Sequence, residues 1–289
     1  MIEKTIPILV FLLMFIIGAS LAAADFKRLK KQPKIILMAT LGQVLLLPLA
    51  AWLLIIATQP VPSVAGGMLL VSLCPGGAMS NIYSLLAKAN VALSVTLTAM
   101  NSLFSVVALP VLIATIFPTL FDFGTDTNGL IKKQSLQLFL VLLCPVLLGM
   151  VLRHLKPTQM IKAMPTLERM GALGLLTLLV AIFIQFQQQI AEQLSSLMVL
   201  AVLFSLLSLI IAYCLCRLLR LQQADEAAVI IEFPVRNLAL TAMIAVSIFN
   251  NSQYLLFAAV FFVVQTPIML AVIVWYRSRL NVTEALNEV

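Results

Sequence analysis

Residues 232–237, Glu-Phe-Pro-Val-Arg-Asn, place an acid, a helix-breaking proline, a base and an amide inside a hydrophobic stretch. Of the eleven acidic residues, only Glu232 lies well inside such a stretch, where a bare carboxylate costs about 2.5 to 3.5 kcal/mol. It therefore needs a partner or a proton. One explanation is an ion pair with Arg236, which lies at i+4 if the helix is continuous. The other is a cation or proton site shared with a second segment, and Pro234 favours it because it disturbs the helix.

The second segment with unusual chemistry is Cys-Pro-Gly-Gly-Ala-Met-Ser-Asn at residues 74–81, again in the middle of a hydrophobic stretch. The proline removes an amide donor and the two glycines free the backbone, so the sequence predicts a broken helix. At membrane depth, unpaired backbone groups are tolerated only where they are buried in protein or line a cavity. A simple proline kink is the alternative, and the glycines and the following Ser80 and Asn81 disfavour it.

Polar side chains also recur along the next hydrophobic stretch, where Ser94, Thr98 and Asn101 are spaced i, i+4 and i+7 on one helix face. Such a stripe supplies either interhelical hydrogen bonds, each worth about 0.6 to 2 kcal/mol, or oxygen ligands for a hard cation. Gln43 is an isolated polar residue of an earlier stretch, and it too suits either a helix contact or a ligand.

Hydrophobic helices must position these residues, because 62% of the 289 residues are hydrophobic and only 10% are charged. An ordinary soluble domain is only about 45 to 50% apolar. The composition therefore predicts an all-α integral membrane protein, since each membrane-crossing helix needs about 20 apolar residues. Nine such spans are predicted, at residues 5–24, 35–58, 64–87, 91–117, 134–152, 170–187, 195–219, 227–249 and 254–276.

The basic residues predict the orientation of the chain. They gather in the connections that follow the first, third, fifth, seventh and ninth spans, which all lie on the same side of the membrane. By the positive-inside rule this side is cytoplasmic, so we expect a multi-pass protein of the cell (inner) membrane with its N-terminus outside and its C-terminus in the cytoplasm. The net charge of +7 is thus explained by topology rather than by nucleic-acid binding.

The sequence offers no motif that would favour an enzyme. It contains no nucleophile elbow, phosphate-binding glycine loop or HExxH motif. Its single histidine, His154, lies in a predicted loop, so no cluster has metal-ligand spacing. The four cysteines fall within predicted spans, where packing is their favoured role. Without an ATP-binding segment, uphill transport must use an ion gradient or the membrane potential, which supplies about 2.3 kcal/mol per charge per 100 mV.

The prolines indicate an internal repeat. Pro110 follows Pro75 by 35 residues, and Pro267 follows Pro234 by 33. Spans one to four therefore correspond to spans six to nine with the fifth unmatched, and an offset of five spans inverts the topology. Inverted repeats with two broken helices are typical of secondary transporters, whose binding site lies where the breaks meet near the bilayer midplane.

Three segments make the chain resemble the bile acid:sodium symporter family over essentially its whole length: residues 74–81, the segment Lys-Ala-Asn-Val-Ala-Leu-Ser-Val-Thr-Leu-Thr at 88–98, and residues 232–237. The resemblance implies a core of two repeats whose broken helices cross, and a smaller panel against which the core moves. It also implies nine helices, because the first of the usual ten is absent. We expect panel helices at 1–33 and 130–190, core halves at 34–129 and 191–289, and broken helices at 64–87 and 227–249.

The resemblance further implies a first sodium site whose ligands come from three separate segments. All five of its residues are present: Ser80, Asn81, Ser94, Thr98 and Glu232.

A second sodium site is implied less completely. It uses Gln43, the same glutamate and backbone carbonyls at Phe233 and Val235. The family has a glutamine where this chain has Arg236, and a glycine where it has Pro234. A guanidinium has five donors, no acceptor and a permanent charge, so it does not coordinate sodium.

We therefore expect Arg236 to replace the second ion, either neutralising Glu232 or facing the substrate, which leaves at most one sodium ion. Family substrates are organic anions, from bile-acid conjugates to small carboxylates, and we expect Asn81, Asn237 and Arg236 beside the substrate.

The leading hypothesis is a secondary transporter of an organic anion that works by alternating access, with sodium as the coupling ion and no other cofactor. An alternative keeps the fold without sodium: a uniporter or a proton-coupled carrier with Glu232 as the protonatable group. A channel or a non-transporting membrane receptor is a third hypothesis, of a different class. Substrate identity and oligomeric state do not follow from the sequence.

Overall fold

The computed structural model describes residues 2–20, 32–77, 79–120, 140 and 143–287, and almost all of them are helical. Within these ranges no strand occurs, and the one β-type pairing is an isolated bridge. Hydrophobic side chains dominate every long helix, as the composition requires. The helices, with short π and 3-10 turns (η), are α1 Ile2–Ser20, α3 Pro33–Leu41, η1 Gly42–Leu46, α4 Leu47–Thr58, α5 Pro62–Leu73, α6 Met79–Leu86, α7 Val91–Leu120, Leu143–Leu155, α9 Pro157–Gln185, α10 Gln187–Leu219, α11 Gln223–Glu232, α12 Leu238–Met243, η2 Ile244–Ile248, η3 Ser252–Tyr254 and α13 Leu255–Asn287.

Several of these helices are long and apolar enough to cross a membrane, so the chain is a multi-pass membrane protein. Four pass this test by themselves, and a fifth passes if the two arms of α7, bent by 52°, count as one span. The four are Pro33–Thr58, Pro157–Gln185, Gln187–Leu219 and Ser252–Arg279. The remaining predicted spans fall on shorter or broken helices, and the one at 134–152 lies partly outside the described residues. The count of nine stays a prediction.

Helix α9 is longer than the span expected at residues 170–187. It begins at Pro157, a residue suited to a first helical turn because its missing N–H would have no partner there. Lys162 and Arg169, expected in a connecting loop, therefore lie on the helix. Hydropathy marks only the part of a helix that lies in lipid, so it does not detect a polar helical extension.

Both predicted helix breaks are confirmed. Helix α5 ends at Leu73, Cys74 is extended with φ −68° and ψ 148°, and the next helix starts at Met79. Helix α11 ends at Glu232, and α12 starts only at Leu238. A proline without an amide donor explains why each helix stops inside the protein, and at the first break two glycines also tolerate close approach.

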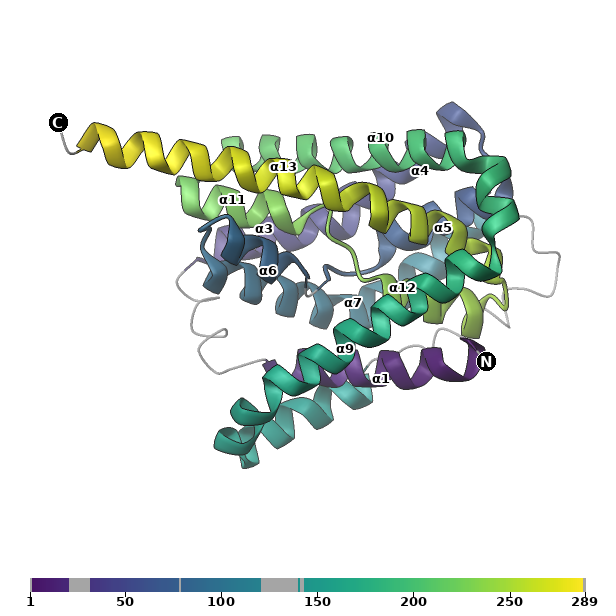
Figure 1. The fold of residues 1–289 in the computed structure, drawn as a ribbon, viewed down its shortest axis with the longest axis horizontal. Helices are drawn as coiled ribbons and strands as arrows, with labels where there is room; N and C mark the ends of the chain where they lie inside the picture. Colours follow the sequence, from purple (N-terminus) through teal and green to yellow (C-terminus); the bar gives the residue numbers. More distant parts are fainter. Residues whose placement is uncertain (1, 21–31, 78, 121–139, 141–142, 288–289) are drawn as a thin grey trace.

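Two groups of helices can be distinguished in Figure 1. Helices α1 and α9 lie together along one side, whereas α10 and α13 run beside each other on the other side. The helix Leu143–Leu155 joins this group by close backbone approach to α1: a side chain at Gly18 of α1 would clash with the carbonyl of Val146, and one at Gly149 would clash with that of Phe15. Small residues at such crossings allow van der Waals packing between helices in lipid.

The second group contains the broken helices. Helices α5 and α13 pack directly, with Gly66 and Gly67 of α5 accommodating Tyr254 and Phe257. Helix α12 lies between the groups, because it contacts α1 and α9 as well as α5 and α13. The crossing of the two breaks is therefore enclosed by helices on several sides.

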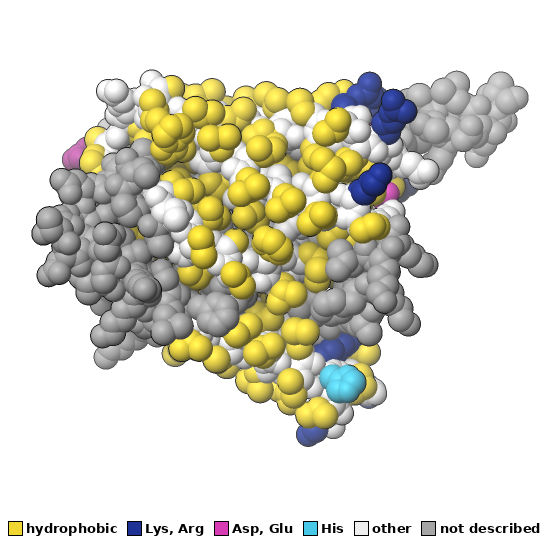
Figure 2. Space-filling model, turned by 180° about the vertical axis from the view of Figure 1, so that it is seen from behind, with side chains coloured by type: hydrophobic (Ala, Val, Ile, Leu, Met, Phe, Trp, Pro, Cys, Tyr) yellow, Lys and Arg dark blue, Asp and Glu magenta, His cyan; other side chains and the backbone are white. Residues whose placement is uncertain are grey.

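The surface agrees with a membrane environment. Figure 2 shows a broad face covered by hydrophobic side chains, with Lys and Arg side chains gathered toward the end of the molecule that carries the C-terminus. Several large apolar residues on the long helices are more than half exposed, among them Leu173 and Val274, as expected where side chains face lipid. The four cysteines are free thiols. Cys74 and Cys216 are buried, which agrees with a packing role, whereas Cys144 and Cys214 are exposed, which does not agree with one.

Candidate functional site

The two helix breaks cross and pair with each other through their backbones. Gly76 and Arg236 form an antiparallel bridge. The N–H of Gly77 donates to the carbonyl of Val235 at 3.0 Å, and the N–H of Asn237 donates to the carbonyl of Pro75, also at 3.0 Å. The N–H and C=O groups left without helical partners at one break thus form hydrogen bonds with those at the other break. Irregular backbone at membrane depth is tolerated only where such groups are paired inside the protein.

Glu232 lies beside this crossing and is fully buried, with 0% of its surface exposed. Its carboxylate accepts a hydrogen bond from Thr98 Oγ1 at 2.8 Å and a longer one from Ser94 Oγ at 3.5 Å. Gly76 is packed so tightly against the carboxylate that any side chain there would collide with Oε1. The last residue of α11 is therefore held against α7 and the first break.

The remaining residues expected at the first ion site surround the same carboxylate. Ser94 donates to Asn81 Oδ1 at 2.9 Å, and Thr98 lies 3.4 Å from the same oxygen. Ser80 Oγ lies 3.2 Å from Thr98 Oγ1 and donates to the carbonyl of Gly77 at 2.9 Å. All five residues are thus brought into one cluster. Its polar groups are carboxylate, hydroxyl and amide oxygens, the ligand types that suit a hard cation.

Arg236 does not pair with Glu232, although the two lie four residues apart. Its hydrogen bonds go instead to Gln43 Oε1, at 2.9 Å from Nη1, and to three main-chain carbonyls. These carbonyls belong to Phe233, Ser72 and Cys74. The helix break between positions 232 and 236 turns the two side chains toward different partners, so the explanation by a continuous-helix ion pair was wrong.

The residues of the expected second ion site are only partly assembled. Gln43, on the π-helical turn η1, accepts hydrogen bonds at one oxygen from both Arg236 Nη1 and Asn101 Nδ2, at 2.9 and 2.7 Å. The carbonyl of Phe233 faces the same guanidinium at 3.5 Å. The carbonyl of Val235 is used by Gly77 in the bridge. The guanidinium therefore lies among the oxygens expected at this site.

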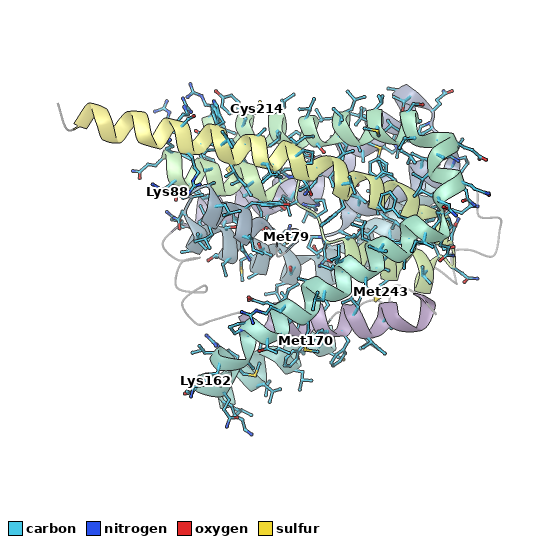
Figure 3. All side chains as sticks on the ribbon, in the orientation of Figure 1. Met79, Lys88, Lys162, Met170, Cys214 and Met243 are labelled. Carbon is cyan, nitrogen blue, oxygen red and sulfur yellow. The ribbon has the colours of Figure 1, made fainter. Side chains whose placement is uncertain are left out.

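The side-chain oxygens of the two asparagines expected near a substrate are already engaged. Asn237 caps α12, because its Oδ1 accepts from the N–H of Leu240 at 3.0 Å. Asn81 is half-buried and directs its Oδ1 to Ser94 and Thr98. Met79, the first residue of α6, is labelled near the middle of the molecule in Figure 3, and Asn81 follows it two positions later.

Sequence reasoning missed some participants. Asn101 was recognised as part of the polar stripe, but its partner is Gln43 rather than Ser94 or Thr98. The carbonyls of Ser72 and Cys74, which bind Arg236, carry no side-chain signal at all. Among the described residues, no group of three His, Cys, Asp or Glu side chains could hold a metal ion.

A family model described as "Sodium Bile acid symporter family" matches residues 7–193. The match covers the first break and the oxygen-bearing residues of α7.

Individual proteins resemble the chain over a larger part of its length. It is 26% identical over 249 residues to the "Uncharacterized sodium-dependent transporter YocS" of Bacillus subtilis (strain 168), which covers 86% of this chain and 76% of that protein. It is 27% identical over 268 residues to the "Probable sodium/metabolite cotransporter BASS2, chloroplastic" of Oryza sativa subsp. japonica, covering 92% and 62%. The match to the "Hepatic sodium/bile acid cotransporter" of Rattus norvegicus is 27% identical and covers 54% and 44%. The chain thus spans less than two thirds of the plant and animal proteins.

Proposed function

The chain belongs to the sodium bile acid symporter family, a family of transporters rather than enzymes, and on this premise we propose that it is a secondary active transporter of an organic anion. Relatives named as sodium-dependent or sodium/metabolite transporters support sodium as the coupling ion. The observation that carries the proposal is the convergence of Ser80, Asn81, Ser94 and Thr98 on the buried carboxylate of Glu232.

One sodium ion binds in this cluster. Thr98 donates its hydroxyl proton to Glu232, whereas Ser94 donates its proton to Asn81 and lies 3.5 Å from the carboxylate; each hydroxyl oxygen keeps lone pairs that can turn toward the ion. Glu232 supplies the negative charge that offsets the cost of dehydrating sodium, and the neutral oxygens complete the coordination.

A second sodium ion is replaced by the guanidinium of Arg236. The side chain is 6% exposed and is surrounded by Gln43 and by main-chain carbonyls, which is an environment of acceptors. A fixed positive charge there repels a further cation, and the effect is strong because the low dielectric of the site screens it poorly. The transporter therefore couples to at most one sodium ion.

The substrate is a small carboxylate or a bile-acid-like anion, bound beside Arg236, Asn237 and Asn81. Arg236 offers the charge that attracts an anion, while the two asparagines flank the crossing from α12 and α6. Relatives named as organic anion and bile acid transporters support this class of substrate.

Transport proceeds by alternating access, in which a core of two inverted repeats moves against a panel. The grouping of α1 with α9 and the position of α12 between that group and α13 support this division. We assign the panel to residues 1–33 and 130–190. The core comprises 34–129 and 191–289, with the N-terminus outside the cell membrane and the C-terminus in the cytoplasm.

A proton-coupled or sodium-independent carrier is the second candidate function. Two observations favour independence from sodium: Glu232 already accepts a hydrogen bond from Thr98, and Arg236 already contributes a fixed positive charge nearby, so the carboxylate is stabilised without a bound ion. In such a carrier, Glu232 would take up and release a proton where the leading proposal has sodium.

Uptake into proteoliposomes tests both candidates. Labelled taurocholate and a series of aliphatic monocarboxylates are offered with an inward sodium gradient, an inward proton gradient, or potassium alone. We expect a sodium gradient to drive accumulation of at least one anion, with a hyperbolic dependence on sodium. Cooperative uptake with two sodium ions would contradict the replacement of the second ion, and accumulation driven by protons without sodium would favour the second candidate.

A further inference from the structure

A small cavity lies next to Arg236 and is lined by residues of α5, α12 and α13. Its volume is about 10 Å³, close to that occupied by one water-sized group. Three polar residues, Arg236, Thr241 and Gln265, contribute to its wall. The rest of the lining is apolar and consists of Val71, Leu238, Ala258, Phe261 and Phe262.

Two hydrogen-bond donors at this cavity have no acceptor. The guanidinium uses Nη1 and Nη2 for its four bonds, which leaves the Nε–H of Arg236 unpaired. The side-chain nitrogen Nε2 of Gln265 is unpaired too, and both residues are more than nine-tenths buried, at 6% and 1% exposure. Thr241 adds no donor, because its hydroxyl donates to the carbonyl of Asn237 at 2.9 Å. Buried donors of this kind are costly unless a ligand accepts from them.

The charge on Arg236 indicates what kind of acceptor suits the cavity. None of the hydrogen bonds of Arg236 is made to a carboxylate, so the guanidinium retains a full positive charge that a negatively charged acceptor would complement. The cavity admits a single atom or small group rather than a whole organic anion.

We propose that Arg236 Nε and Gln265 Nε2 together form a subsite that receives one carboxylate oxygen of the transported anion. The inference rests on the proposed function and adds Gln265 of α13 as a residue that determines substrate affinity. Helices α12 and α13 line the cavity together with α5, and both contact α9. Figure 1 shows α9 crossing over α12. The subsite thus lies in the helices that meet the panel, against which the core moves.

Substitution of Gln265 tests the subsite while leaving Arg236 and the sodium cluster in place. Gln265→Leu removes the donor with little change of volume. Gln265→Glu places a carboxylate of the protein beside the Nε–H of Arg236, so that the protein itself fills the subsite. Gln193→Leu is the matched control, since it removes another incompletely paired glutamine on α10, away from the cavity.

The measurement is the thermal stabilisation of the full-length protein in detergent, titrated with taurocholate and with monocarboxylates from acetate to hexanoate in chloride-free sodium buffer. Loss of one charge-assisted hydrogen bond predicts about a tenfold higher half-saturating concentration for Gln265→Leu, and a larger increase is expected for Gln265→Glu, whose carboxylate occupies the subsite. Stabilisation by sodium alone, and anion binding by Gln193→Leu, should match the wild type.

The outcomes separate the subsite from the wider proposal. Anion binding within twofold of the wild type in both Gln265 variants would overturn the subsite while leaving the transport function intact. A Gln265-dependent stabilisation by chloride alone, with none by carboxylates, would assign the cavity to a free halide and overturn the inference. If the wild type neither binds nor takes up any organic anion, the proposed function fails, and the carboxylate subsite fails with it.

Discussion

Arg236 and Gln43 are 193 positions apart in the chain, yet Nη1 of the first donates to Oε1 of the second at 2.9 Å. Asn101 donates to the same oxygen at 2.7 Å. The main-chain carbonyls of Ser72, Cys74 and Phe233 accept the other hydrogen bonds of the guanidinium. Neutral oxygens thereby hold the permanent positive charge of Arg236 in the protein interior. Without the guanidinium, the same oxygens would lose this hydrogen-bond donor and could face an ion.

The first prediction follows from this relationship. Replacing Arg236 by glutamine removes the fixed charge and restores an amide oxygen beside Gln43, so we expect a second sodium ion to bind. The Hill coefficient for sodium in proteoliposome uptake should rise from about 1 toward about 2, the number of sites. Arg236→Lys is the control, because it keeps the charge and should stay non-cooperative. An unchanged sodium dependence in Arg236→Gln would contradict the idea that the guanidinium stands in for an ion.

The second prediction concerns stability. Gln43→Leu leaves the donors of Arg236 and Asn101 without their shared acceptor, and both side chains are buried. We expect a loss of about 2 to 4 kcal/mol, since each buried unpaired donor costs about 1 to 3 kcal/mol. The unfolding temperature in detergent measures the loss. Gln193→Leu, whose side chain has no such partners, should shift it far less, and equal shifts would argue against the shared hydrogen bonds.

The third prediction addresses the oxygen cluster. Thr98→Val removes the hydroxyl that contacts Glu232, Asn81 and Ser80 while preserving the shape of the side chain. Loss of one oxygen ligand and of its hydrogen bonds should raise the half-saturating sodium concentration about tenfold. Sodium-dependent thermal stabilisation provides the measurement. Thr115→Val, on the same helix but exposed and bonded only within that helix, should behave like the wild type.

The fourth prediction concerns the close approach at the crossing. A Cβ at Gly76 would collide with Oε1 of Glu232, and the backbone bridge to Arg236 prevents the segment from moving away. We expect Gly76→Ala to abolish sodium-dependent uptake. Gly174→Ala is a demanding control, because its Cβ would lie 2.5 Å from Leu9 Cδ1, the flexible end of a side chain that can shift. Uptake by Gly76→Ala at the wild-type rate would show that the contact is not needed.

The sequence predicted the broken helices well because the cause of each break is local. Pro75 with its two glycines, and Pro234, interrupt hydrogen bonding wherever they occur in a helix. The sequence was less informative about the length of α9, since its first turns are polar and carry no hydrophobic signal. It also did not indicate which oxygens bind Arg236, because three of the four are main-chain carbonyls that any residue provides.

By itself, the sequence determined that the chain is a membrane protein, where its helices break, and which side chains could serve a cation. Composition, proline position and polar spacing are properties of the chain alone. Tertiary structure decided which groups meet. It separated Arg236 from Glu232 and made Gln43 the shared acceptor of Arg236 and Asn101. It also placed the hydroxyls of Thr98 and Ser94 beside Glu232. These pairings depend on how two broken helices cross, and that crossing is fixed by long-range packing and by the backbone bridge between Gly76 and Arg236.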